Sequence, residues 1–220
     1  MKVEKVVIHE KTVVDRITEI HLKTFDGFFL TFMGRGFLRQ MYRSYCDHSR
    51  SGILIAVDDD RIIGFLAYSE DLSALYKHML KSRLIPFAWY SIGAFFRKPA
   101  TFARIVRAFL KPRESRRSEA YVELASIGVD PEAKGMGVGS LLVSALKMQT
   151  NFDVFEYITL ETDAVDNNAA IRFYVKNGFE ATRQFQTHEG RRMIEYRFYG
   201  KDNVFENENI ETSLHTQHHQ

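Results

Sequence analysis

The sequence has few cysteines, which stabilise secreted proteins as disulfides, and no long apolar run of the kind that crosses a membrane. Its 220 residues include a single cysteine, Cys46, and four prolines. One cysteine excludes an internal disulfide, so we expect a reducing, cytoplasmic environment. The longest uncharged apolar run, residues 84–96, has 13 residues, whereas a membrane-spanning helix needs about 20. The first ten residues contain no apolar stretch typical of a secretion signal.

A strong excess of one charge is also missing, although charge is concentrated locally. The chain has 30 Lys and Arg residues against 28 Asp and Glu, a net charge of +2 that gives no general attraction for nucleic acid. Residues 77–117, however, hold eleven Lys or Arg and one acid, Glu114, so this segment carries +10 and the rest of the chain −8. A basic segment on an acidic body indicates an anionic partner for that segment.

The apolar spacing predicts an α/β domain. We expect strands at residues 3–8, 52–57, 62–68, 119–129, 157–162, 179–187 and 192–199, and helices at 12–25, 37–45, 137–148 and 168–177, the last ended by Gly178. The strand–helix–strand order over 119–162 implies a parallel pair in a mixed sheet. Residues 1–200 are predicted to form one domain with a basic helical insert at 70–118, followed by a disordered polar tail at 201–220.

The densest glycine pattern follows directly after the strand predicted at 119–129. Gly135, Gly137 and Gly139 alternate with other residues and open a helix. Glycine lets the backbone approach a ligand closely, and the first N–H groups of a helix carry a partial positive charge that suits a pyrophosphate. A P-loop does not fit because no Lys-Ser or Lys-Thr follows, and a dinucleotide loop would need a glycine at Ser140. A coenzyme A loop and a plain flexible turn both fit the pattern.

In this segment the chain resembles the GNAT superfamily of acetyl-CoA-dependent N-acetyltransferases. The coenzyme motif of that family, [QR]-x-x-G-x-[GA] after V-x-P, compares with Val129-Asp-Pro131 followed by Lys134-Gly-Met-Gly-Val-Gly139. Lys134 departs from the usual Gln or Arg but keeps a long polar side chain. Residues 167–179 are similar to a second family block, N-x-x-A-x-x-x-Y-x-x-x-G-F. The resemblance covers about residues 3–199 and fails over the basic insert.

The resemblance implies a GNAT-like mixed, mostly antiparallel sheet with a splayed parallel strand pair flanked by helices. It also implies acetyl-CoA as cosubstrate and no metal. The pantetheine arm of the coenzyme would lie between the strands at 121–129 and 157–162, and an N–H near Ile127 would polarise the thioester carbonyl. Such oxyanion donors are commonly worth about 10²–10³ in rate. The residues implied in coenzyme binding are Ile127, Gly128, Val129, Lys134, Gly135, Met136, Gly137, Val138, Gly139, Ser140 and Asn167.

Four side chains in this region have two interpretations each. Tyr174 matches the family tyrosine that protonates the departing thiolate, and it would otherwise pack its ring in the core. Glu123 and Glu161 are candidates for the base that accepts the amine's proton, because family members use a glutamate from either strand, but an exposed strand-edge carboxylate fits each equally well. Asn167 matches the asparagine that contacts pantetheine, and a helix N-cap is the alternative.

We therefore expect an N-acetyltransferase that moves acetyl from acetyl-CoA to a primary amine of a small molecule, an amino sugar being one candidate. A protein or peptide N-acetyltransferase and a non-catalytic acyl-CoA sensor are the alternatives. No nucleic acid partner is expected. The basic insert, which interleaves aromatic residues with cations, fits an anionic acceptor, a membrane surface or carrier protein, or a solvated helical lid. The sequence is also compatible with a homodimer.

Overall fold

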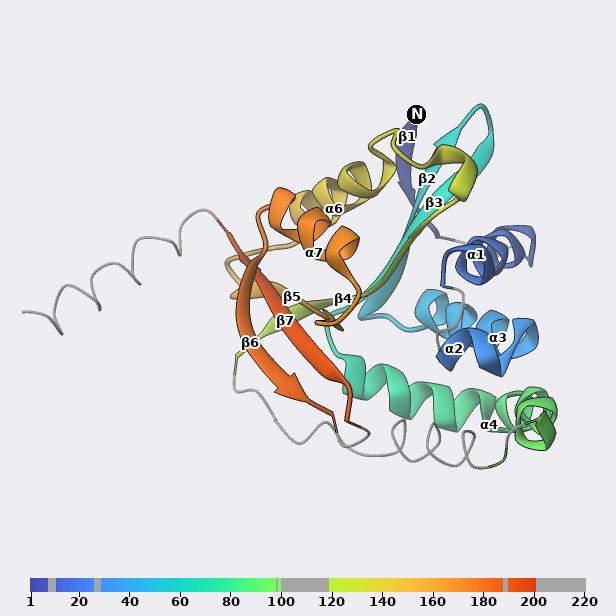
Figure 1. The fold of residues 1–220 in the computed structure, drawn as a ribbon. Helices are drawn as coiled ribbons and strands as arrows, with labels where there is room; N and C mark the ends of the chain where they lie inside the picture. The colour runs from blue at the N-terminus through green and yellow to red at the C-terminus, as the bar shows by residue number, and fades with distance from the viewer. Residues whose placement is uncertain (8–10, 26–28, 98, 100–118, 188–189, 201–220) are drawn as a thin grey trace, which may run out of the picture. The chain divides into compact units, whose positions relative to one another are not determined.

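Strands and helices alternate along the chain as the sequence predicts. The computed structural model describes residues 1–7, 11–25, 29–97, 99, 119–187 and 190–200 (Figure 1). Its elements are β1 (Lys2–Lys5), α1 (Lys11–Thr24), α2 (Phe29–Met33), α3 (Arg35–Asp47), β2 (Ser51–Asp58), β3 (Arg61–Ser69), α4 (Leu72–Arg97), β4 (Tyr121–Val129), a 3₁₀ turn η1 (Pro131–Ala133), α6 (Val138–Gln149), β5 (Tyr157–Asp163), α7 (Asn168–Lys176), β6 (Glu180–Gln186) and β7 (Arg192–Tyr199). The predicted tail at 201–220 and residues 98 and 100–118 of the predicted insert lie outside the described residues.

These strands form one mixed sheet. Its order is β1-β2-β3-β4-β5-β7-β6, with antiparallel neighbours throughout except for the parallel pair β4–β5. The Glu156 amide donates to the Ala120 carbonyl at 2.8 Å, and the Tyr121 and Tyr157 rings stack beside it. The predicted fold class is thereby confirmed. The chain divides into two compact units, residues 1–118 with 123–149 and residues 119–122 with 150–220, which are described separately below.

In the first unit, the hairpin β2–β3 is buried on both faces. Its turn places Asp59 at φ 45° and Asp60 at φ 59°, the left-handed pair of a two-residue hairpin turn. Helices α1 and α3 lie on one face, and α6 lies on the other (Figure 1). Gly64 faces α6, because a Cβ there would come within 2.7 Å of Val138 Cγ1. Coverage of both faces accounts for the weak polar–apolar alternation in the sequence of these strands.

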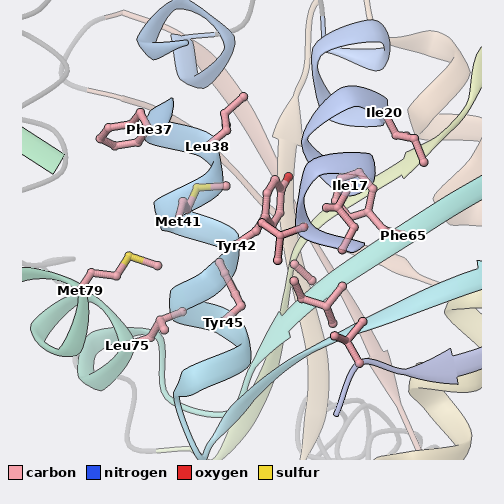
Figure 2. Packing of buried hydrophobic residues seen from close by; sticks show 14 of the residues in the cluster. Ile17, Ile20, Phe37, Leu38, Met41, Tyr42, Tyr45, Phe65, Leu75 and Met79 are labelled. Atoms are coloured by element: carbon pink, nitrogen blue, oxygen red, sulfur yellow. The ribbon is translucent and has the colours of Figure 1, made fainter. Parts of the chain in front are cut away.

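The main core lies between the hairpin and helices α1, α3 and α4. Figure 2 shows Ile17 of α1, Tyr42 of α3 and Phe65 of β3 converging, with Leu75 and Met79 of α4 on the far side of α3. The Tyr42 and Phe65 rings meet edge to face with centroids 5.2 Å apart. Edge-to-face pairs of this kind add to the stabilisation from burial.

Helix α4, in the predicted helical insert, spans 26 residues and consists of two helical halves joined at a kink. Arg83 leaves the helical conformation at φ −136°, and Pro86 follows three residues later. Proline has no N–H for the carbonyl four residues before it, so the helix bends there. The Arg83 side chain donates to Gln40 at 2.9 Å and pairs with Asp47, both on α3. Within the described residues, no helix combines the length and apolar character that crossing a bilayer requires.

In the second unit, β7 lies between β5 and β6, and α7 packs on one face. The Tyr174 ring of α7 lies among Phe173, Phe179 and Tyr196 with centroids 5.2–6.0 Å apart. Gly178 has φ 73°, and the Phe179 amide donates to the Tyr174 carbonyl at 3.0 Å. This is the glycine-terminated helix end that the sequence predicts.

A buried histidine on α1 couples the stability of the first unit to pH. His21 is 3% exposed, and its Nδ1 lies 2.6 Å from the Tyr42 hydroxyl, while Nε2 has no hydrogen-bond partner among the described residues. Burial lowers the pKa of His21 from 6.5 to about 4. Between these values the unfolded chain holds a proton that the folded chain does not, so the free energy of unfolding decreases as pH falls through this window.

We predict that His21→Gln reduces the pH dependence of stability. The free energy of unfolding of the wild type should fall by on the order of 2–3 kcal/mol more than that of the variant between pH 7 and pH 4. Urea unfolding at a series of pH values measures both slopes. His48 and His78 are present in both proteins, so equal slopes would show that His21 does not titrate differently on folding.

Candidate functional site

The glycine segment after β4 forms a loop that only glycine accommodates without strain. Gly135 has φ 89° and Gly137 has φ 80°, both in the left-handed region. A Cβ at either position would meet no atom within 4 Å. The backbone conformation therefore requires glycine, and the space beside the loop is open to a ligand in this structure.

Helix α6 begins directly at this loop. The Leu141 amide donates to the Gly137 carbonyl at 3.0 Å, so Gly137 precedes the first turn. The amides of Val138, Gly139 and Ser140 therefore belong to that turn, where N–H groups have no partner inside the helix. Val138 is buried and packs this turn against Gly64 of β3. Such a helix start attracts a diphosphate through its amides and its dipole.

Asp130 fixes the point at which β4 passes into the loop. The residue is 2% exposed, and its Oδ1 accepts from the Glu132 amide at 3.1 Å while Oδ2 pairs with Arg16 of α1. Burial alone would raise the pKa of Asp130, but the Glu132 amide and Arg16 outweigh it and hold the pKa below its usual value. Arg16 also donates to the Ile62 carbonyl at 3.0 Å. Arg16 was not identified from the sequence, because no local motif links α1 to residue 130.

Strand β4 carries a bulge next to the predicted coenzyme residues. Ala67 of β3 pairs with Ser126 and Tyr68 with Leu124, which leaves Ala125 as an extra residue. The bulge puts Glu123 and Ser126 on the same face, whereas regular alternation would put them on opposite faces. Ser126 is also hydrogen-bonded to Tyr42, the partner of His21.

The predicted pantetheine-binding backbone follows this bulge. Ile127 pairs with Leu66 and Val129 with Gly64 across β3–β4. The Thr24 hydroxyl donates to the Val129 carbonyl at 3.1 Å, so this carbonyl keeps one lone pair for a further donor. Gly128 is closely packed, because a Cβ there would lie 2.7 Å from Phe65 Cε1.

Glu123 is buried rather than exposed at a strand edge. Its exposed fraction is 5%, so the strand-edge interpretation is wrong for this residue. It lies opposite Ser69 in the β3–β4 register. Ser69 Oγ lies 2.8 Å from Ser51 Oγ, and Ser51 Oγ lies 2.9 Å from Nδ1 of the half-buried His48. A series of hydroxyl groups thus leads from the strand position of Glu123 toward the surface.

Glu161 has a different environment, in the second unit. It is half-buried on β5 and lies opposite Glu195 of β7. Glu195 is buried and accepts from Arg197 Nε at 2.7 Å, with Arg183 Nη2 at 3.2 Å. Residues 195 and 196 alternate in direction along β7, so Glu161 and the Tyr174 ring, which packs on Tyr196, lie on opposite faces of these strands.

Asn167 precedes α7 but does not cap it. No hydrogen bond joins its side chain to the first turn of the helix. Instead, Nδ2 donates to Thr162 Oγ1 at 2.6 Å and to the Asp163 carbonyl at 3.2 Å. The N-cap alternative is therefore wrong, and Asn167 ties the start of α7 to the end of β5.

Comparison with known proteins identifies the family. Residues 15–179 match the family model described as Acetyltransferase (GNAT) family. The chain belongs to the GNAT family. A sequence search among curated proteins finds no match. The family assignment confirms the resemblance seen in the two sequence blocks and makes this GNAT protein an acyltransferase by class.

Solved GNAT structures share the fold at low sequence identity. A GNAT-family protein from Desulfovibrio desulfuricans is 16% identical, with a TM-score of 0.58, over 90% of this chain and 98% of its own. The ribosomal-protein-S18-alanine N-acetyltransferase of Escherichia coli is 14% identical, with a TM-score of 0.54, over 92% and 97%. Arabidopsis thaliana NAA60, solved with acetyl-CoA, is 15% identical, with a TM-score of 0.54, over 90% and 97%. These likenesses support the fold alone.

Metal-binding geometry is not found in the described part of this GNAT chain. Nowhere in it do three or more His, Cys, Asp or Glu side chains gather in a way that could hold a metal ion. The expectation of metal-free chemistry stays a prediction.

We predict that Gly137→Val abolishes acetyl-CoA binding without unfolding the protein. The branched side chain would fill the open space beside the loop and strain a left-handed backbone by about 1–2 kcal/mol. Gly190→Val is the matched control, since Gly190 has φ 85° in the β6–β7 connection and only one atom within 4 Å of its Cβ position. Calorimetry with acetyl-CoA and thermal unfolding measure both variants. Equal coenzyme affinity in the two would mean that the diphosphate does not bind this loop.

Proposed function

We propose that this GNAT protein transfers the acetyl group of acetyl-CoA to the primary amine of a small molecule. The observation that carries the proposal is the loop at Gly135 and Gly137, whose left-handed backbone leaves open space directly before the α6 amides. Lys134 and Met136, both exposed, flank the same space. A diphosphate fits this set of donors because it needs several N–H groups and a positive dipole and no side-chain bulk.

The reaction follows from the chemistry of a thioester and an amine. The amine nitrogen forms a bond to the carbonyl carbon, the carbon–sulfur bond breaks, and sulfur leaves with the electron pair and takes a proton. The β4 amide near Ile127 would stabilise the negative charge that develops on the carbonyl oxygen. Cys46 supports direct attack, because burial raises the pKa of this thiol to about 11 and leaves almost no thiolate to form an acyl-enzyme.

Tyr174 is proposed to supply the proton to sulfur. Burial raises its pKa to about 12, so the phenol is protonated at every physiological pH. The hydroxyl would donate a strong hydrogen bond to sulfur as the carbon–sulfur bond breaks, the departing sulfur would take this proton, and solvent would return one to the phenolate. The packing of the Tyr174 ring holds the hydroxyl in one orientation.

Glu123 is proposed as the group that accepts the amine's proton. Glu123 is buried on β4, and a carboxylate within hydrogen-bond reach of the amine, or one water away, can accept its proton. Ser69, Ser51 and His48 continue from its position as hydroxyl and imidazole groups that can pass a proton on. Glu161 lies opposite Glu195, which is engaged by two arginines.

Tyr174→Phe should lower kcat roughly 10²-fold and leave the KM for acetyl-CoA nearly unchanged. The phenylalanine keeps the ring contacts with Phe179 and Tyr196, so the fold should persist. Tyr196→Phe is the control, because it removes a hydroxyl from the same aromatic cluster and should leave kcat within about twofold. Steady-state kinetics with thiol detection measures both variants, and equal rates for Tyr174→Phe and wild type would exclude the acid role.

Glu123→Gln should lower kcat/KM roughly 10²-fold at pH 7. The loss of kcat/KM should become smaller as pH rises toward 10, because an amine with a pKa of about 10 is then largely deprotonated before it binds. Glu161→Gln is the matched control and should change the pH–rate profile little. A larger loss in the control than in Glu123→Gln would assign the base to Glu161 instead.

The acceptor class is tested by thiol release over amino sugars, polyamines, amino acids and peptides with free N-termini. Turnover with a small-molecule amine supports the proposal. Turnover confined to peptides would establish the peptide N-acetyltransferase alternative, and coenzyme binding without thiol release on any acceptor would indicate a sensor. The single Cys46 favours a cytoplasmic protein.

A further inference from the structure

The second half of α4 exposes an apolar stripe that the fold does not use. Ile85, Trp89, Ile92 and Phe96 are spaced i, i+4, i+7 and i+11, which places them on one face of the helix. Their exposed fractions are 82%, 70%, 46% and 77%. This set is called the α4 stripe below. It follows the kink at Arg83, where the helix changes direction (Figure 1).

The α4 stripe is distinct from the face that holds the helix on the protein. Phe87 and Ser91 are buried, and the Phe87 ring lies 4.8 Å from that of Phe37 on α3. A surface helix of a globular protein normally has a polar face opposite its buried one. Here the face away from the core is also apolar, so core packing does not explain the stripe. Exposed apolar patches of this kind mark interaction surfaces.

The charge around the stripe has one sign. The 42 residues from 72 to 113 contain no Asp or Glu and nine Lys or Arg. Two of these cations, Lys77 and Lys81, are exposed on the first half of α4, and Arg97, which ends the helix, and Lys98 follow the stripe in sequence. An apolar stripe with aromatic residues, on a segment whose own sequence carries cations and no acids, matches the interface of an anionic lipid bilayer, although Asp47 of α3 pairs with Arg83 at the kink.

We propose that the α4 stripe docks this protein on an anionic membrane surface, with Trp89 and Phe96 in the headgroup–acyl boundary and Lys77 and Lys81 among the lipid phosphates. A second copy of this chain fits less well, because two such surfaces would bring cations against cations with no acid to offset them. The inference goes beyond acetyl transfer and does not depend on which acceptor is used.

The test uses the full chain and its only tryptophan. Trp89 is the single Trp of the sequence and belongs to the stripe, so intrinsic fluorescence reports on the stripe alone. Vesicles of phosphatidylcholine with 30% phosphatidylglycerol should shift the emission to shorter wavelength, and pure phosphatidylcholine vesicles should do so far less. Raising the salt from about 0.1 M to about 0.5 M should weaken binding several-fold, because salt screens the attraction between cations and phosphates.

Ile85→Ser combined with Phe96→Ser should lower partitioning onto anionic vesicles at least tenfold, as measured by co-sedimentation, while keeping Trp89 as reporter. Lys77→Glu with Lys81→Glu should weaken it at least tenfold as well, since each cation near an anionic surface is worth about fivefold. Met148→Ser with Val175→Ser is the matched control, because these side chains are equally apolar and exposed on α6 and α7. The control should bind as the wild type does.

The outcomes separate membrane docking from the other occupants. Binding to anionic vesicles that the stripe variant loses and the control keeps supports the proposal. Absence of binding to either vesicle type overturns it, as does equal binding to neutral and anionic vesicles. A dimer in light scattering that the stripe variant abolishes, without vesicle binding, would assign the stripe to self-association. Retention on an immobilised acidic acyl-carrier protein, again without vesicle binding, would assign it to a protein partner.

Discussion

The buried ion pair between Asp130 and Arg16 is the interaction on which the candidate site depends. It joins the end of β4 to α1, two segments 114 residues apart in sequence. Asp130 is the buried partner and Arg16 is half-buried, so removing Arg16 would leave the buried carboxylate without its main cation, which is destabilising. With the carboxylate held, the backbone leaves β4 through the η1 turn in one direction and reaches Gly135 and Gly137 in their left-handed conformations. The start of α6 then follows with its amides at the open side of the loop.

Buried polar groups on β4 connect this loop to the rest of the first unit. The bulge at Ala125 turns both Glu123 and Ser126 to the face that carries Phe65, where α1 and α3 pack. Ser126 is hydrogen-bonded to Tyr42, whose hydroxyl contacts His21 Nδ1, and Glu123 lies opposite Ser69 in the strand register. Unsatisfied polar groups in a core are costly, so each of these contacts restricts how β4 can shift. A strand fixed in this way keeps the amides near Ile127 in one place, which preorganised charge stabilisation requires.

Helix α4 differs from β4, because packing fixes only its first half closely and leaves apolar side chains of its second half exposed. Its first half fills the core with Leu75 and Met79, and beyond the kink Phe87 and Ser91 are the buried residues among those whose side chains the structure describes. The kink near Pro86 thus separates a structural half from a half whose outward side chains remain exposed.

The sequence alone determined the family and most of the elements, because those depend on local patterns. The hairpin at 51–69, the end of α7 at Gly178 and the glycine loop each follow from residues adjacent in the chain, where turn geometry and helix ends are decided. Only the tertiary structure decided which carboxylates are buried, because burial depends on segments that meet across the fold. It made Glu123 a core residue, set Glu161 on the face opposite Tyr174, turned Asn167 toward β5 and paired Asp130 with Arg16. The Asn167 contacts are local, four and five residues back in the chain, but the others need partners from distant strands or helices, which no local pattern encodes.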